Sequence, residues 1–180
     1  MDLSFLCVWW YTMYMETFCT SFPPICNKTC RVVILGSMPG AASLSAQGYY
    51  AHKQNSFWPI LFALWDVPLP QSYQEKIRHA LLHHVAIWDV IATCTRKGSG
   101  DAAIRDATIN DFSAFFAGCP DIHTVFHNGK LSQRLFAQHA PSFAAEKRCI
   151  TLPSTSPAYA VPFADKLSAW QIVRESAERK

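Results

Sequence analysis

The stretch from residue 35 to residue 61, LGSMPGAASLSAQGYYAHKQNSFWPIL, joins a small-residue loop to a group of aromatic and amide side chains. The loop GSMPG (36–40) consists of residues that let a backbone approach a ligand closely. Tyr50, His52 and Asn55 follow it, and the whole stretch contains no Asp or Glu. Aromatic faces and amides suit a nucleobase, and a loop free of carboxylates suits phosphate. The pattern therefore favours a nucleic-acid or nucleotide ligand.

Two other loops of small or amide-bearing residues follow predicted strands, HNGK (127–130) and LPSTSPA (152–158). Residues 32–65, 122–145 and 147–164 contain no Asp or Glu, so we expect carboxylates to lie away from all three loops. Basic residues are expected in or beside the three loops, namely Arg31, Lys53, Lys130, Arg134, Lys147 and Arg148. Because backbone N–H groups and basic side chains attract anions, this distribution favours a phosphate-bearing ligand.

Each of these signals also has a purely structural interpretation. GSMPG alone is a turn, and Tyr49 and Tyr50 would then be core or surface aromatics. Other chemistries have less support, because the chain has no GxSxG elbow and its glycine loop lacks the Lys-Ser/Thr ending of a P-loop. Cys26 and Cys30 lack a second pair of ligands, and the histidines lack ligand spacing. We therefore predict no metal site.

The elements that must position these loops alternate along the chain. A buried strand is predicted at 31–36, because this is a short apolar run rich in β-branched residues, and further strands are predicted at 85–91, 123–129 and from residue 147 into the Pro/Ser loop. Helices are predicted at 55–65, 73–84, 110–118, 130–140 and 162–179, the third capped by Thr108 or Asn110, and residues 95–107 are predicted as a polar loop. Such alternation predicts an α/β fold with three layers, α/β/α, around a mainly parallel four-stranded sheet. Ligands of such sheets bind beyond the carboxyl ends of the strands, where the three loops lie.

Composition bounds the organisation of the chain. Half of the 180 residues are hydrophobic and the formal net charge is only +3, so one folded domain is expected and any positive potential must be local. We expect residues 1–20 to be an apolar extension outside the fold and residues 21–180 to be the single domain. The apolar part of the extension is too short to span a bilayer, although a peripheral membrane anchor is an alternative. Seven cysteines in a chain of this length favour reduced thiols in the cytoplasm.

LGSMPG…YYAHKQNSFWPIL together with LPSTSPA resembles the uracil-DNA glycosylase superfamily, whose motifs 1 and 2 the two loops match. The resemblance covers roughly residues 21 to 175 and is closest to the branch that releases hypoxanthine from DNA. It implies a three-layer fold of the uracil-DNA glycosylase type. It also implies a DNA repair enzyme that flips a deaminated base out of the helix and hydrolyses its N-glycosidic bond.

The mismatch-specific uracil glycosylases carry a similar stretch, G-I-N-P-G followed by F-A-H-P-x-N-R-F-W. Against it, Met38 stands where those enzymes have a catalytic Asn, and Tyr50 stands where they have a base-stacking Phe. His52, Asn55 and Phe57-Trp58 match. Motif 2 also lacks the His of the classical uracil enzymes. The resemblance to the hypoxanthine branch therefore implies that the amide of Asn55 takes over catalysis.

The resemblance supplies roles for the remaining residues. Base or substrate binding is expected from Gly36, Ser37, Met38, Pro39, Gly40, Tyr50, His52 and Asn128. DNA binding is expected from Lys130, Ser154, Thr155, Ser156 and Pro157. The expected partner is DNA that contains a damaged or deaminated base. We expect a monomer without metal, cofactor or stable membrane association.

Two alternatives remain open at this stage. A glycosylase of the same fold that prefers uracil opposite guanine would use the same loops. A nucleic-acid-binding module that has lost catalysis would explain why motif 1 has Met38 in place of Asn.

Overall fold

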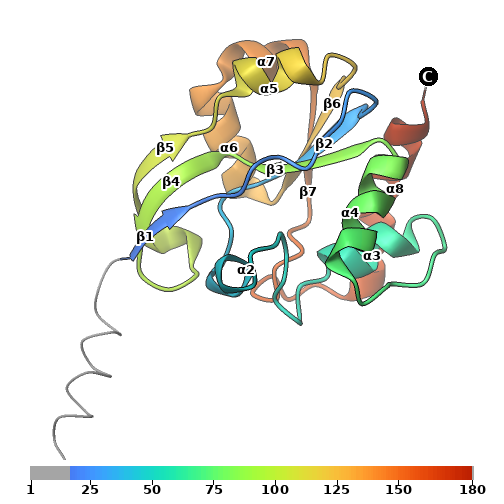
Figure 1. The fold of residues 1–180 in the computed structure, drawn as a ribbon, viewed down its shortest axis with the longest axis horizontal. Helices are drawn as coiled ribbons and strands as arrows, with labels where there is room; N and C mark the ends of the chain where they lie inside the picture. The colour runs from blue at the N-terminus through green and yellow to red at the C-terminus, as the bar shows by residue number, and fades with distance from the viewer. Residues whose placement is uncertain (1–16, 180) are drawn as a thin grey trace, which may run out of the picture.

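A central parallel sheet organises the molecule, which we describe from a computed structural model for residues 17–179 (Figure 1). Its strands are β2 (Val32–Gly36), β3 (Val85–Asp89), β6 (Thr124–Asn128) and β7 (Arg148–Leu152), in the order β3-β2-β6-β7. All neighbouring pairs are parallel. Every residue of β2 and β3 is buried, which agrees with their continuous apolar sequences. The four predicted strands are confirmed.

Helices cover both faces of this sheet, so the three-layer α/β/α architecture is confirmed (Figure 1). One layer holds α3 (Phe57–Ala63), α4 (Tyr73–Leu82) and α8 (Phe163–Glu178). The other holds α5 (Phe112–Gly118), α6 (Lys130–His139) and α7 (Pro141–Glu146). The short helix α2 (Ala41–Ala46) follows loop 36–40. Aromatic residues fill the core, and Phe57 and Trp170 bring α3 and α8 together edge to face at 5.9 Å between ring centroids.

A second, antiparallel sheet was not predicted. It consists of β1 (Thr17–Thr20), β4 (Ile91–Arg96) and β5 (Ile104–Ile109), in the order β1-β4-β5, with the short 3-10 helix η1 (Asp101–Ala103) before β5. The polar loop predicted at 95–107 is therefore partly wrong. Four of the six β5 residues are exposed, so the strand lacks the apolar pattern that would reveal it.

The boundary predicted for the N-terminal extension also changes. Residues 17–20 form β1 and pair with β4 from Thr17↔Arg96 to Thr20↔Thr93, so they belong to the fold. The rest of the predicted extension, residues 1–16, lies outside the described residues. No helix of the described part is long and apolar enough to cross a membrane. The six cysteines within residues 17–179 are free thiols.

The cap of α5 also differs from the prediction. Asp111 caps the helix, because its side chain accepts a hydrogen bond from the Ala114 amide at 3.0 Å. Thr108 lies in β5 instead, and Asn110 donates its side-chain amide to the Asp89 carbonyl at 2.9 Å. The predicted cap was one to three residues early.

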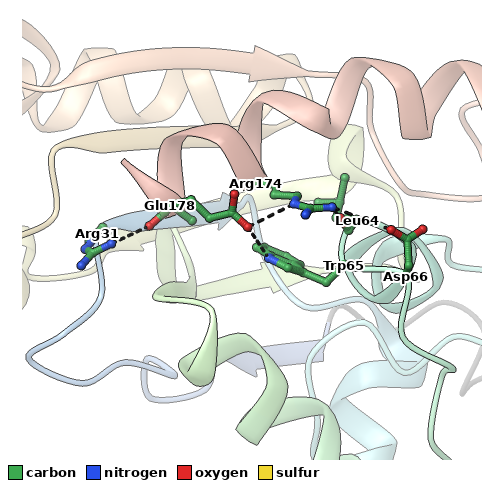
Figure 2. Close-up of polar contacts among 7 residues, drawn as sticks. Arg31, Leu64, Trp65, Asp66, Arg174 and Glu178 are labelled. Atoms are coloured by element: carbon green, nitrogen blue, oxygen red, sulfur yellow. Dashed lines mark hydrogen bonds and ion pairs between the residues drawn. The ribbon is translucent and has the colours of Figure 1, made fainter. Parts of the chain in front are cut away.

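The C-terminal helix α8 is held to the rest of the domain by a group of polar contacts (Figure 2). Arg174 donates to the carbonyl of Leu64 at 2.8 Å, just beyond the end of α3, and its Nε donates to Glu178 at 3.1 Å. Trp65 donates its ring N–H to the same carboxylate at 3.1 Å. Arg31, before β2, donates to the Ala177 carbonyl at 3.2 Å. These contacts fix α8 against α3 and against the amino end of β2.

Candidate active site

The carboxyl ends of the parallel strands form one edge, and the residues predicted to bind a ligand lie along it. Gly36 at the end of β2 is in register with Asp89 at the end of β3. Asn128 at the end of β6 is in register with Leu152 at the end of β7. Loops 36–40 and 153–158 leave the sheet from this edge, as the topology of a parallel sheet requires.

The strand-end segments are hydrogen-bonded to one another through Thr155. The Asn128 side chain donates to the Thr155 hydroxyl and accepts from the Thr155 amide, both at 2.8 Å. On its other side, the Thr155 carbonyl accepts the backbone N–H of Ser56 at 3.1 Å and the Ser56 hydroxyl at 3.2 Å. Thr155 is fully buried. The loop after β7 is therefore fixed both to the end of β6 and to the start of α3.

The aromatic ring of Tyr50 is packed on one face against another ring. The ring stacks on Phe57 with centroids 3.7 Å apart and an angle of 13° between the planes. Phe57 is completely buried, whereas Tyr50 is only half-buried. The backbone of Tyr50 has a φ of 56°, which is uncommon for an aromatic residue and is typical of functional positions. A flat ring of this kind provides a platform on which a base can stack.

Asn55 lies between Tyr50 and α3. Its side-chain oxygen accepts the backbone N–H of Phe57 at 3.0 Å, and its own N–H donates to the His52 carbonyl at 2.8 Å. The side-chain nitrogen of Asn55, Nδ2, donates no hydrogen bond to any residue within 17–179. One half of the carboxamide thus orders the start of α3, and the other half remains available to a ligand or water.

Loop 36–40 is shaped by the β4–β5 hairpin. Ser37 donates its hydroxyl to Asp101 at 3.0 Å, and the Pro39 carbonyl accepts from the buried Arg96 guanidinium at 2.6 Å. Gly40 precedes α2 and accepts the Leu44 amide at 3.0 Å. The expectation that carboxylates lie away from this loop is wrong, because Asp101 touches it.

The Met38 side chain lies in a small apolar cluster with Cys19, Ile91 and Cys94, and it is 7% exposed. This cluster joins loop 36–40 to β1 and β4. Any contact of Met38 with a ligand would therefore be made by its backbone.

The other predicted site residues lie in more open positions. His52 is exposed, and its ring accepts the Gln54 amide at 3.2 Å. Lys130 is exposed at the first position of α6, directly after Gly129. In the loop after β7, Pro157 is exposed, while Ser154 and Ser156 are half-buried and accept local backbone amides at 3.2 and 3.3 Å.

Asp89 is a site residue that the sequence analysis missed. A Cβ atom at Gly36 would overlap its Oδ1 atom and would lie 3.1 Å from the Tyr50 hydroxyl. Its other oxygen accepts from the Ser21 hydroxyl at 3.2 Å. The available signal was an acidic residue that ends the apolar strand VAIWD, on the strand next to β2.

Burial controls the charge of the groups at this edge. Loss of solvation raises the pKa of Asp89 from 3.8 to about 7, with Ser21 and Arg96 lowering it and Asp101 raising it further. Burial also raises the pKa of the Tyr50 hydroxyl, and the neighbouring Asp89 adds to that increase. Near neutral pH the edge therefore holds a phenol and a carboxyl group that is only partly ionised.

The basic residues divide between the two edges of the sheet. Lys53 is exposed in the turn before Asn55, on the side of the site. Arg31 and Arg148 stand at the amino ends of β2 and β7, so they lie at the opposite edge, and Lys147 lies over the ring of Phe116 there, 5.2 Å from its centroid. The expectation that all six basic residues flank the loops is therefore wrong. Among the described residues, no group of three or more His, Cys, Asp or Glu side chains has an arrangement that could hold a metal ion.

Comparison with known proteins adds evidence independent of this geometry. A family model described as the uracil DNA glycosylase superfamily matches residues 23–174. A protein of Methanosarcina barkeri named hypoxanthine DNA glycosylase is 34% identical over 112 residues, which are 62% of this chain and 71% of that protein. Another of the same name from Methanosarcina acetivorans is 31% identical over 110 residues, 61% of this chain and 70% of that protein. The solution NMR structure of a proposed uracil DNA glycosylase from Methanosarcina acetivorans matches with a TM-score of 0.76 and 26% identity, covering 91% of this chain and all of the other.

Proposed function

This chain belongs to the uracil DNA glycosylase superfamily, and from that membership we propose that it is a DNA repair enzyme that hydrolyses the N-glycosidic bond of hypoxanthine in DNA. Two relatives with more than 30% identity bear the name hypoxanthine DNA glycosylase, which supports this substrate. One observation carries the proposal. Hydrogen bonds through Thr155 join Asn128 to Ser56, the residue after Asn55, and the Tyr50 ring stacked on Phe57 lies beside this connection. One site thus combines a stacking platform with an unused amide nitrogen.

The reaction begins with extrusion of the deoxyinosine nucleotide, since its sugar carbon is out of reach inside the duplex. Unpairing costs a few kcal/mol and is least for a poorly paired base, which favours lesions. The base then stacks on Tyr50, an interaction worth ~1–3 kcal/mol. Backbone groups of Ser37 and Met38 face its edge.

Bond cleavage moves charge from the sugar to the base. The bond from C1′ to N9 breaks and its electron pair leaves with the base, while a water oxygen forms the new bond to C1′. One proton of that water is lost as the bond forms, and the departing base gains one proton, so that hypoxanthine and an abasic sugar result. The Asn55 amide orients the water or holds the base, and the phosphates of the DNA stabilise the cationic sugar. The protein needs no carboxylate for the attack on C1′ in this scheme.

The loop 153–158 binds the DNA strand on either side of the extruded nucleotide. Ser154 and Ser156 are half-buried beside the exposed Pro157, and Lys130 is exposed at the start of α6. Hydroxyl, backbone N–H and ammonium groups are the usual ligands of DNA phosphates. This segment therefore holds the backbone while Tyr50 holds the base.

The direct test is an oligonucleotide with a single deoxyinosine, treated with alkali after incubation so that abasic sites are cut. Asn55→Ala is expected to reduce cleavage at least tenfold. The Asn55 oxygen also accepts the Phe57 N–H, so Asn55→Ala removes a helix cap as well as the amide. Asn55→Ser is the matched variant, because it keeps an oxygen for the helix start and lacks the amide. Equal losses in both variants, with unchanged circular dichroism, would support a catalytic amide. Wild-type rates in either variant would exclude it.

A panel of oligonucleotides with uracil opposite guanine, xanthine and an alkylated purine tests the choice of base. Faster release of uracil than of hypoxanthine would favour the mismatch-uracil alternative. Binding to deoxyinosine DNA without release of any base would favour a binding module.

A further inference from the structure

Two polar groups that the reaction above leaves unused, the Asp89 carboxyl group and the Tyr50 hydroxyl, lie together beside Gly36. The Asp89 Oδ1 atom takes the volume that a side chain at Gly36 would fill, and the Tyr50 hydroxyl lies 3.1 Å from the same point. The hydroxyl is buried, which raises its pKa, and it lies beside the Asn128 side chain, which lowers it, but it forms no hydrogen bond of normal geometry within the described residues. Asp89 uses its Oδ2 atom for Ser21.

The neighbouring polar groups of the edge are already engaged. Both ends of the Asn128 amide bond to Thr155, and the Ser37 hydroxyl bonds to Asp101. Asp89 Oδ1, by contrast, has no hydrogen-bond partner among residues 17–179, and like the Tyr50 hydroxyl it lies next to loop 36–40, where it could bond a base.

The surroundings of Asp89 disfavour its charge. It is 3% exposed, and no cation forms an ion pair with it within residues 17–179. The ionisable groups that face it are Tyr49 and Tyr50 after α2, Asp101 before β5 and Arg96 on β4. Burial and Asp101 together outweigh Arg96 and raise the pKa of Asp89 to about 7, so a large share of the molecules carry an uncharged acid at neutral pH.

An uncharged carboxyl group can donate a hydrogen bond, whereas a carboxylate only accepts. Negative charge develops on the departing base, so a fixed donor beside the base lowers the barrier and a fixed negative charge raises it. The environment of Asp89 is of the kind that keeps a carboxylic acid neutral for donation at neutral pH.

We propose, resting on the proposed function, that Asp89 is a further catalytic residue that works as an uncharged acid, donating a hydrogen bond from its carboxyl O–H to the departing base. The proton stays on Asp89 throughout, so the balance of the hydrolysis is unchanged. Gly36 is required because any side chain there would displace the acid from this position.

The test is the single-turnover rate of hypoxanthine release between pH 5.5 and pH 9. The wild-type rate is expected to fall about tenfold per pH unit above neutral pH as Asp89 ionises. Asp89→Asn keeps an N–H donor that does not titrate, so it should stay within about tenfold of the wild-type rate at pH 6 and lose the alkaline decrease. Asp89→Leu, which has no donor, should lose at least a hundredfold relative to wild type at pH 6 and should show no alkaline decrease.

Two controls separate this role from others. Asp121→Asn changes an exposed carboxylate at the opposite edge of the sheet and should leave the pH profile intact. Tyr50→Phe should retain the alkaline decrease, because that decrease is assigned to Asp89. Loss of the decrease in Tyr50→Phe would assign it to the phenol and overturn the proposal.

Binding of free hypoxanthine, followed by calorimetry, gives a readout that does not depend on turnover. Wild type and Asp89→Asn should bind it, and Asp89→Leu should bind at least tenfold more weakly. An alkaline decrease that persists in Asp89→Asn, or full activity and binding in Asp89→Leu, would overturn the role of Asp89 alone. If wild type neither releases nor binds hypoxanthine, the proposed function fails and this inference fails with it.

Discussion

At the scale of single residues, the candidate site consists of small polar side chains, several of which form hydrogen bonds with one another. Asn128 and Thr155 satisfy each other, and the Asn55 oxygen orders the first turn of α3. A buried donor or acceptor that loses its partner costs ~1–3 kcal/mol. These bonds hold the loops in place without a ligand, and they leave Asp89, the Tyr50 hydroxyl and the Asn55 nitrogen for the substrate that we propose.

The buried carboxyl group of Asp89 makes a prediction about stability as well as rate. Its pKa in the folded state is about 7, above the value of 3.8 for a free carboxyl group, so folding favours the protonated form. Its contribution to stability is complete below pH 3.8 and is lost as the pH rises through 7. The free energy of unfolding should fall by up to roughly 1.4 kcal/mol per pH unit across this range, relative to Asp89→Asn.

Urea denaturation of wild type and Asp89→Asn at pH 5 and pH 8 checks this. The Asn variant should gain stability over wild type from pH 5 to pH 8, and Asp121→Asn should not. A constant difference between wild type and Asp89→Asn at the two pH values would contradict a buried, protonated Asp89.

Sequence patterns predicted the groups of the candidate site that stand on the loops themselves, such as Tyr50 and Asn128, and their roles stay predictions. They missed Asp89, because it lies in a different part of the chain and reaches loop 36–40 only through the register of β2 with β3. Met38 shows the converse limit. Its position in the motif is visible in the sequence, but the direction of its side chain depends on β1 and β4, whose pairing carries no local signal.

At the scale of elements, Thr155 connects β6, the loop after β7 and the start of α3. Thr155→Val keeps the shape of the side chain and removes the hydroxyl that accepts from Asn128. Since the Asn128 amide would then lack one partner, we expect a loss of ~1–3 kcal/mol in the free energy of unfolding. We also expect slower base release, because the loop would hold DNA less rigidly.

Thermal denaturation and single-turnover kinetics of Thr155→Val test this connection. Thr151→Val is a suitable control, because Thr151 is an exposed residue of β7. Similar stability and rate in both variants would show that the bond between Thr155 and Asn128 is dispensable.

Helices and strands could be predicted from the sequence where burial produces a regular pattern of apolar residues. β2 and β3 are buried along their whole length, and each of the five predicted helices is present, within a few residues at either end. β5 was missed because most of its side chains face solvent, so pairing with β4 rather than an apolar pattern determines it. Long-range pairing of polar segments is what local periodicity cannot reveal.

At the scale of the whole molecule, the small formal charge of +3 hides an uneven distribution of basic residues. Lys53 and Lys130 are exposed on the side of the site, whereas Arg148 stands at the opposite edge. DNA that binds the proposed site should therefore release few counterions, and its affinity should depend only moderately on salt.

Removal of one phosphate contact lowers the slope of log K against log salt by about 0.9. Lys53→Ala and Lys130→Ala should each show such a decrease and a weaker affinity for an oligonucleotide with deoxyinosine. Arg148→Ala should leave both quantities unchanged. Fluorescence anisotropy at several salt concentrations measures this, and an effect of Arg148→Ala as large as that of Lys130→Ala would place the DNA elsewhere.

The contacts between the β4–β5 hairpin and loop 36–40 have a consequence for how base preference can change. Arg96, Ser99 and Asp101 bond to Pro39, Ala41 and Ser37, respectively. The curvature of the backbone that we propose to contact the base is thus set by a segment that need not meet the base. Evolution, or a library randomised only at residues 97–103, can therefore retune which lesion is accepted while every residue that meets the nucleotide stays the same.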